Sequence, residues 1–116
     1  MIARARPRPP QTPARAAGVF AALGDPTRLA LVNRLSDGSR RSIAQLSEGH
    51  PVTRQAITKH LRVLEDARIV RHERAGRERL YALDPAPIEE LRRYIDWVSS
   101  QWDARLARLK ALVEQA

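Results

Sequence analysis

Residues 53–83 have the sequence TRQAITKHLRVLEDARIVRHERAGRERLYAL, in which the spacing of the apolar residues changes part-way along. Ile57, Leu61 and Leu64 recur every three or four residues, which is the period of a helix with one buried face. In the residues that follow, the period falls to two, as in a β-strand, and Gly76 can occupy the turn to a second strand. The stretch therefore predicts an amphipathic helix followed by a β-hairpin.

The outer face of this helix carries polar side chains where the inner face carries apolar ones. Thr53 is positioned to cap the helix, and Val52 before it can pack on Ile57 as a hydrophobic staple. The outward positions hold short polar or basic residues, namely Arg54, Gln55, Thr58, Lys59 and Arg62. Side chains of these types can reach the base edges and phosphates of DNA.

Three further helices are predicted on the N-terminal side. The first has apolar residues at helical spacing from Ala16 to Leu23, and Gly24 follows as its stop. Asp25 followed by proline is a cap signal for the second helix, which extends to Leu35. Ser42-Ile-Ala-Gln has the spacing of a capping box and begins a short third helix.

A long helix is predicted on the C-terminal side, beginning after Asp84-Pro85. Apolar residues recur every three or four positions from Ile88 to Val113, and so continuous a stripe predicts a helical partner. We expect a homodimer whose interface is built by this helix and the first one: Val19, Phe20, Leu91, Ile95, Val98, Trp102, Leu106 and Leu109.

Composition limits the classes of protein that fit. The 116 residues, 43% of them apolar, suffice for one domain, and the formal net charge of +8 favours an anionic partner such as a nucleic acid. Residues 40–83 hold ten Lys and Arg against five Asp and Glu, so the charge is concentrated around the predicted hairpin. The chain contains no cysteine, which excludes a disulfide framework and thiolate metal sites.

The two ends of the chain differ in character. Residues 1–13 contain four prolines and three arginines without apolar periodicity, which predicts a disordered basic arm preceding a domain over residues 14–116. No apolar run approaches the length needed to span a bilayer, and the N-terminal residues lack the apolar core of a signal peptide. These features predict a cytoplasmic protein without a membrane partner.

The order of elements predicts a winged helix-turn-helix: a mainly α fold with a two-stranded β-hairpin wing. In such a fold the helix at residues 53–64 would enter the major groove of double-stranded DNA, with base reading expected from Arg54, Gln55, Thr58 and Lys59. The basic wing at residues 71–79 and the start of the third helix would contact the backbone, with the contacts expected from Arg40, Arg41, Ser42, Thr53, His60, Arg62, Arg74 and Arg77.

A family resemblance adds to this interpretation. The run FAALGDPTRL at residues 20–29, with ITKHLRVL at 57–64 and ARIV at 67–70, resembles the ArsR family of bacterial repressors over roughly residues 16–113. The resemblance implies a homodimeric repressor that binds an operator in its ligand-free form and is released by an inducer, often a metal.

The sequence departs from the metal-sensing members of that family. Residues 42–49 contain no Cys or His, and the last helix contains no His. His50, His60 and His72 lie on a turn, a helix and a strand, so we expect no metal site and no cofactor. A small-molecule inducer remains open; Tyr94, Trp97 and Trp102 could line a pocket between protomers, although aromatic residues at this spacing are more often interface core.

Other functional classes fit the sequence less well. No catalytic triad, carboxylate pair in a cleft or phosphate-binding glycine loop is present, so we expect no enzyme. A sequence-indifferent architectural DNA-binding protein would need only the basic charge. A winged-helix module that binds protein or RNA would not need the polar face of the helix at residues 53–64. Competition between an operator and bulk DNA distinguishes these alternatives.

Overall fold

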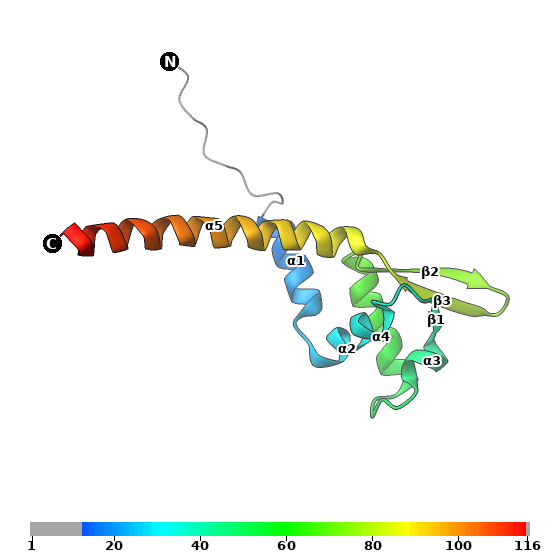
Figure 1. Cartoon of the computed structure of the whole chain (residues 1–116). Helices are drawn as coiled ribbons and strands as arrows, with labels where there is room; N and C mark the ends of the chain where they lie inside the picture. Colours follow the sequence, from blue (N-terminus) through cyan, green and yellow to red (C-terminus); the bar gives the residue numbers. More distant parts are fainter. Residues whose placement is uncertain (1–12, 116) are drawn as a thin grey trace, which may run out of the picture.

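The computed structural model describes residues 13–115, which form a helical body from which one long helix and one hairpin extend (Figure 1). The elements, in chain order, are α1 (Pro13–Leu23), α2 (Pro26–Leu35), β1 (Arg41–Ser42), α3 (Ile43–Ser47), α4 (Arg54–Asp66), β2 (Val70–Ala75), β3 (Glu78–Leu83) and α5 (Pro85–Gln115). Of the basic arm predicted at residues 1–13, residues 1–12 lie outside the described part, and residue 13 already belongs to α1.

Three helices begin at the caps that the sequence predicts. The Asp25 carboxylate accepts a hydrogen bond from the Arg28 backbone N–H at 3.0 Å at the start of α2. At α3, the Ser42 hydroxyl accepts from the Gln45 N–H at 3.1 Å, and the Gln45 side chain accepts from the Ser42 N–H at 2.9 Å, which completes the capping box. Thr53 caps α4 by accepting from the Ala56 N–H at 3.1 Å.

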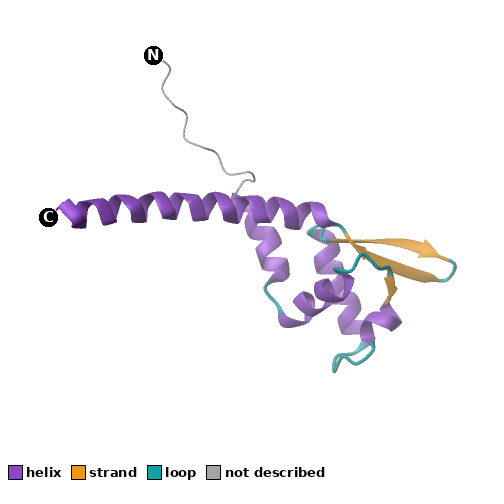
Figure 2. Ribbon diagram, in the orientation of Figure 1, coloured by secondary structure: helices purple, strands orange, loops and turns teal. Residues whose placement is uncertain are grey.

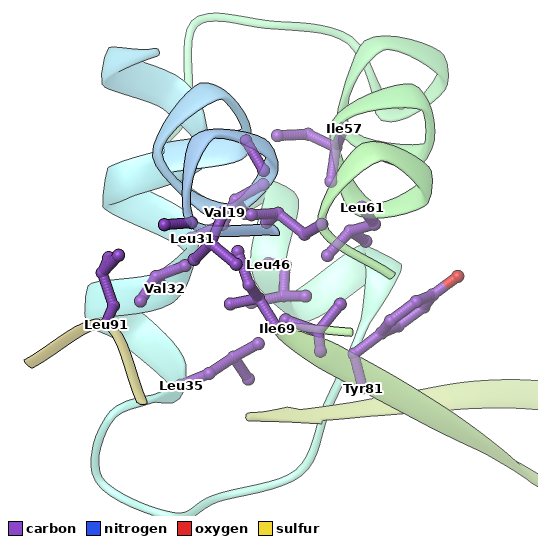
Figure 3. Close-up of a cluster of buried hydrophobic side chains, with 14 residues drawn as sticks. Val19, Leu31, Val32, Leu35, Leu46, Ile57, Leu61, Ile69, Tyr81 and Leu91 are labelled. Carbon is purple, nitrogen blue, oxygen red and sulfur yellow. The ribbon is translucent and has the colours of Figure 1, made fainter. Parts of the chain in front are cut away.

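The core lies where α1, α2, α3 and α4 meet the base of the sheet (Figure 3). The apolar positions that the helical period selects in α4, Ile57, Leu61 and Leu64, are fully buried. They pack in one cluster with buried side chains from the other elements, including Val19, Leu31, Val32, Leu35, Leu46, Ile69, Tyr81 and Leu91. Burying a side chain of this size contributes about 1.5 to 3 kcal/mol, so this cluster fixes the orientation of α4.

The sheet has three strands in the order β1-β3-β2, one more than the predicted hairpin. Strands β2 and β3 pair antiparallel from Val70↔Leu83 to Ala75↔Glu78, and Gly76, at φ +66°, lies in the tight turn between them. Arg74, part of the predicted wing, belongs to β2. Strand β1, only two residues long, pairs with β3 and is too short to show an alternating pattern in the sequence.

Helix α5 begins after Asp84, whose carboxylate accepts from the Ala86 N–H at 3.1 Å, and continues for 31 residues. At 1.5 Å per residue it is about 46 Å long, and its C-terminal half projects beyond the helical body (Figure 2). None of the described helices is both long enough and apolar enough to cross a membrane.

The structure corrects two residues of the expected dimer interface. Val19 and Leu91 are each only 5% exposed, because they belong to the core of the chain's own fold, where α1 and α5 pack together. They are therefore not available to a partner. Ile95, Trp102 and Leu106 are about half exposed within the single chain, as are Phe20 and Leu109, whereas Val98 is half-buried.

Candidate nucleic-acid interface

The outer face of α4 presents the polar side chains that the sequence assigns to base reading. Arg54, Gln55 and Lys59 are exposed on the side of the helix opposite its buried residues, and Arg62 is exposed one turn further along. Thr58 is half-buried, and its hydroxyl donates to the Arg54 carbonyl at 2.8 Å, which leaves mainly acceptor capacity at its oxygen. Thr53 uses its hydroxyl as the helix cap.

The turn between α3 and α4 is held by an arginine that the sequence did not single out. The Arg34 side chain, from α2, donates to the carbonyls of Leu46 and Glu48 at 3.0 Å each. These contacts satisfy acceptors at the end of the short α3, and Gly49 then takes the left-handed conformation at φ +73°. The turn therefore presents the N-terminus of α4 in a fixed direction. No local pattern indicates this role for Arg34.

His60, expected to contact the DNA backbone, makes contacts within the chain. Its Nδ1 lies 3.3 Å from Nη1 of Arg28 and 3.8 Å from the carboxylate of Asp25, so the ring faces the start of α2. Arg28 also donates through Nε to the Ala22 carbonyl at 2.6 Å. His60 thus joins α4 to the junction of α1 and α2, and its contact with the DNA backbone stays a prediction.

The same junction has an electrostatic consequence. The backbone N–H of Arg28 donates to the Asp25 carboxylate, and the charges of His60 and Arg28 lie nearby; together they lower the pKa of Asp25 from its ordinary value. Asp25 is therefore a fully ionised helix cap at neutral pH. The ionised cap also complements the positive end of the α2 dipole.

The wing carries its arginines in a geometry that favours an anionic partner. Arg74 and Arg79 are directly opposite each other in the β2–β3 register, and Arg77 lies at the turn. All three side chains are exposed. Like charges directly opposite on a hairpin are destabilising unless an anion neutralises them. Arg79 was absent from the expected contacts because its pairing with Arg74 is visible only in the register.

The base of the wing is attached to the helical body. His72 of β2 forms a close hydrogen bond with the Glu65 carboxylate of α4, and its ring packs against Tyr81 of β3 at a centroid distance of 5.3 Å. Glu73, the next residue of β2, pairs with Arg40 at 2.9 Å. Direct side-chain contacts therefore connect the wing to the C-terminal part of α4 and to the segment before β1.

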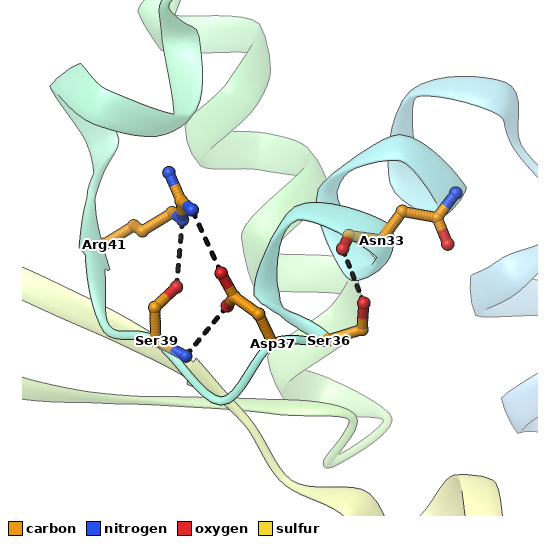
Figure 4. Close-up of polar contacts among 5 residues, drawn as sticks. All are labelled: Asn33, Ser36, Asp37, Ser39 and Arg41. Atoms are coloured by element: carbon orange, nitrogen blue, oxygen red, sulfur yellow. Dashed lines mark hydrogen bonds and ion pairs between the residues drawn. The ribbon is translucent and has the colours of Figure 1, made fainter.

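The residues before α3 are arranged differently from the expectation. Arg41 donates to the Asp37 carboxylate at 3.3 Å and to the Ser39 hydroxyl at 3.0 Å (Figure 4). Hydrogen bonds from the Ser39 side chain and backbone, together with Arg41, lower the pKa of Asp37. Ser42 is buried and uses its hydroxyl in the capping box, so it is unavailable to phosphate, which corrects its assignment. Arg40 is exposed despite its ion pair with Glu73.

The histidines are not arranged as metal ligands. Within residues 13–115, no group of three or more His, Cys, Asp or Glu side chains is close enough to hold a metal ion. His60 and His72 are each engaged with a carboxylate on a different part of the fold.

Comparison with known proteins agrees with this geometry. Residues 23–73 match the family model described as a helix-turn-helix domain. The chain is 43% identical over 75 residues to the HTH-type transcriptional regulator Rv2034 of Mycobacterium tuberculosis, covering 65% of this chain and 69% of that one. It also superimposes on an ArsR-like transcriptional regulator from Rhodococcus sp. RHA1 with a TM-score of 0.75 and 37% identity, covering 85% of this chain and 92% of the other.

The chain belongs to the ArsR family of transcriptional regulators. A further relative, the HTH-type transcriptional repressor SmtB of Mycobacterium tuberculosis, is 38% identical over 76 residues, which cover 65% of this chain and 56% of the relative. The expected winged helix-turn-helix fold is confirmed. As a member of the ArsR family, the protein is a regulator with a domain that binds double-stranded DNA, and it is not an enzyme.

Proposed function

We propose that the protein is a homodimeric repressor that reads an inverted-repeat operator with α4 and contacts the DNA backbone with its wing. The observation that carries this proposal is the outer face of α4, which is polar, exposed and directed by a core of fully buried residues on its other side. Repression is supported by the similarity to SmtB of Mycobacterium tuberculosis, which is a transcriptional repressor.

Base reading is assigned to the first turns of α4. The guanidinium of Arg54 can form two hydrogen bonds with guanine O6 and N7, and the amide of Gln55 can pair with adenine N6 and N7. Lys59 lies one turn further along, and Thr58 contributes its methyl group and an acceptor oxygen. Contacts to phosphate position the dimer without specifying sequence. We assign them to Arg40, Arg41, Arg62, Arg74, Arg77 and Arg79.

The exposed stripe on α5 supports the homodimer. Ile95 is 47% exposed, and Trp102, Leu106 and Leu109 are each 57% exposed, all on one projecting helix. Phe20 of α1, 43% exposed, extends the apolar surface. Apolar residues in such a stripe are stabilised when a second copy covers them. A twofold dimer would place two α4 helices on half-sites about 34 to 36 Å apart.

Metal independence is the second part of the proposal. Two of the three histidines are held by carboxylates on different elements, so no pair of imidazoles converges. We expect zinc, cadmium, copper and nickel to leave operator affinity unchanged. A stoichiometric loss of binding with any of these metals, abolished by replacing His50 or His72, would contradict this part.

The proposal is tested with DNA titrations of the wild type, Arg54→Ala and Arg77→Ala at several salt concentrations. Arg54→Ala should lower operator affinity by about 1 to 3 kcal/mol per half-site and relax base preference. Arg77→Ala should weaken operator and scrambled DNA alike and reduce the salt slope by about one per contact. Arg108→Ala, which removes one charge from α5 outside both surfaces, is the matched control.

The outcome separates the alternatives. If Arg54→Ala weakens operator and scrambled DNA equally, Arg54 does not read bases. If the wild type itself shows no preference for the operator over scrambled DNA, the protein is an architectural DNA-binding protein and the repressor proposal is wrong.

A further inference from the structure

A groove of about 730 Å³ lies between α1, the C-terminal end of α4 and the first turn of α5. Its volume is in the range of sites for small molecules, about 300 to 1,000 Å³. Small or apolar side chains form most of its walls: Ala14, Gly18, Val19, Ala21, Ala22, Val63, Ala67 and Pro87. None of the aromatic residues of α5 lines it, so it is distinct from the inter-protomer pocket considered from the sequence.

The charged residues of the groove are predominantly basic. Arg15, Arg28 and Arg68 line it against a single carboxylate, Asp66. Arg15 is paired with Glu90 at 3.5 Å. The Arg28 guanidinium donates to the carbonyls of Ala21 and Ala22, which fix its position, and its charge lies near the ionised Asp25 carboxylate. Of the three lining arginines, Arg68 is the one without a carboxylate partner among the ion pairs of residues 13–115, and an unpaired guanidinium beside an apolar wall favours an organic anion.

Arg68 lines the groove directly after the C-terminal cap of α4. It is the only residue other than glycine with a positive φ in the described part of the chain, at +61°. A side chain with a Cβ is sterically unfavourable in that region, where glycine is accommodated without penalty. Its side chain is exposed at the groove and enters none of the ion pairs observed among residues 13–115. The positive φ belongs to a Schellman motif that ends α4, in which the Arg68 N–H donates to the Glu65 carbonyl and the Ile69 N–H to the Leu64 carbonyl, at 2.9 Å each. What Arg68 contributes to the groove is therefore its exposed guanidinium.

We infer that this groove binds a small organic anion, with the apolar part of the molecule against α1 and the anionic group on the Arg68 guanidinium. A carboxylate suits the planar guanidinium, which can form two parallel hydrogen bonds with it. The N-terminal residues 1–12, which directly precede α1, are a poor match because they carry three arginines and no acidic residue.

The location gives the ligand a regulatory role. Val63 and Asp66 of the groove belong to α4 and Ala67 is its C-terminal cap; the other end of α4, about 20 Å away along the helix axis, carries Arg54. A ligand that contacts both α1 and the C-terminal end of α4 stabilises the orientation of α4 in which both contacts form. Ligand binding therefore shifts the equilibrium toward that orientation. This regulatory part rests on the proposed function, whereas the binding site itself does not.

The site is tested by isothermal titration calorimetry of the full chain without DNA. The probes are 2-naphthoate and 2-naphthylmethanol, which share an aromatic body and differ in the anionic group. The wild type should bind naphthoate at least about tenfold more tightly than the alcohol, since a charge-assisted pair with Arg68 forms only with the anion. Arg68→Gly, which also relieves the backbone, should remove that advantage and leave binding of the alcohol unchanged.

Two further variants sharpen the result. Arg108→Ala removes a positive charge from α5 away from the groove and should bind naphthoate as the wild type does. Asp66→Asn removes the one carboxylate lining the groove and should strengthen naphthoate binding. Absence of naphthoate binding, equal affinity for the two probes, or unchanged binding by Arg68→Gly would each overturn the assignment.

The regulatory part has its own readout. Saturating naphthoate should change the operator affinity of the wild type, and by linkage the operator should change naphthoate affinity by the same factor. Arg68→Gly should show neither effect. If calorimetry shows the expected binding but operator affinity is unaffected, the site stands and its regulatory role is wrong. If the protein binds no DNA, the proposed function fails while the calorimetric result remains interpretable.

Discussion

Replacing Arg68 with glycine should make the protein more stable although it removes a large side chain. Arg68 directly follows the C-terminal cap of α4 and has φ +61°. The left-handed conformation costs a residue with a Cβ about 1 to 2 kcal/mol. Glycine removes this cost but loses about 0.5 to 1 kcal/mol more through the freedom of the unfolded chain. At the mid-points of the two ranges, the balance is a net stabilisation of about 0.75 kcal/mol.

This change is large enough to measure. For a chain of 116 residues, an unfolding entropy of about 2.1 cal/mol/K per residue converts it to a rise in Tm of about 2 to 4 °C. Calorimetric scans must be made at one protein concentration, because a dimer has a concentration-dependent Tm.

The matched control is Ala67→Gly, one residue earlier, where φ is −83° and a Cβ is unstrained. There glycine should lower the free energy of unfolding by about 0.5 to 1 kcal/mol. An Arg68→Gly protein with unchanged or lower Tm would refute the reasoning, since it would mean that contacts of the Arg68 side chain outweigh the backbone strain.

Three other changes test separate parts of the structure. Leu106→Glu should convert the dimer to a monomer in light scattering, because carboxylates desolvated at the interface cost several kcal/mol in each protomer; a monomeric wild type at tens of micromolar would contradict the interface. The free energy of unfolding should fall as pH drops through the lowered pKa of folded Asp25, below its ordinary range near pH 4, because the stabilisation belongs to the ionised form. Asp25→Asn keeps a helix cap without a charge, so urea unfolding from pH 7 to pH 3 should show a flatter profile, and an unchanged profile would exclude Asp25 as the source. Ser42→Ala should lower the free energy of unfolding by about 0.5 to 2 kcal/mol, with little effect from Ser36→Ala, whose hydroxyl is exposed; equal effects would argue against the capping box as the cause.

The sequence was sufficient for features whose causes lie within a few residues of one another. The caps at Asp25, Ser42 and Thr53 depend on a side chain and a backbone N–H three residues away, and all three form as predicted. The buried face of α4 depends only on the helical period. The polar outer face follows from the same period, so the candidate base-reading residues could be selected without a structure.

Features that join distant parts of the chain needed the tertiary structure. His60 and Arg28 are 32 residues apart, and no local pattern shows that they meet at the start of α2. The pairing of Arg74 with Arg79 depends on a hairpin register with a two-residue turn, which a loop shifted by two residues would change.

The apolar stripe of α5 shows the same division. Its period determines that one face is apolar, but not which neighbour covers each residue. Leu91 is buried in the chain's own core, whereas Trp102 and Leu106 lie beyond the helical body and remain exposed. The groove beside Arg68 is also a product of packing, since its walls come from four helices. Sequence periodicity shows which side chains lie on the apolar face of a helix. Only the three-dimensional arrangement of the helices determines which residues those side chains contact.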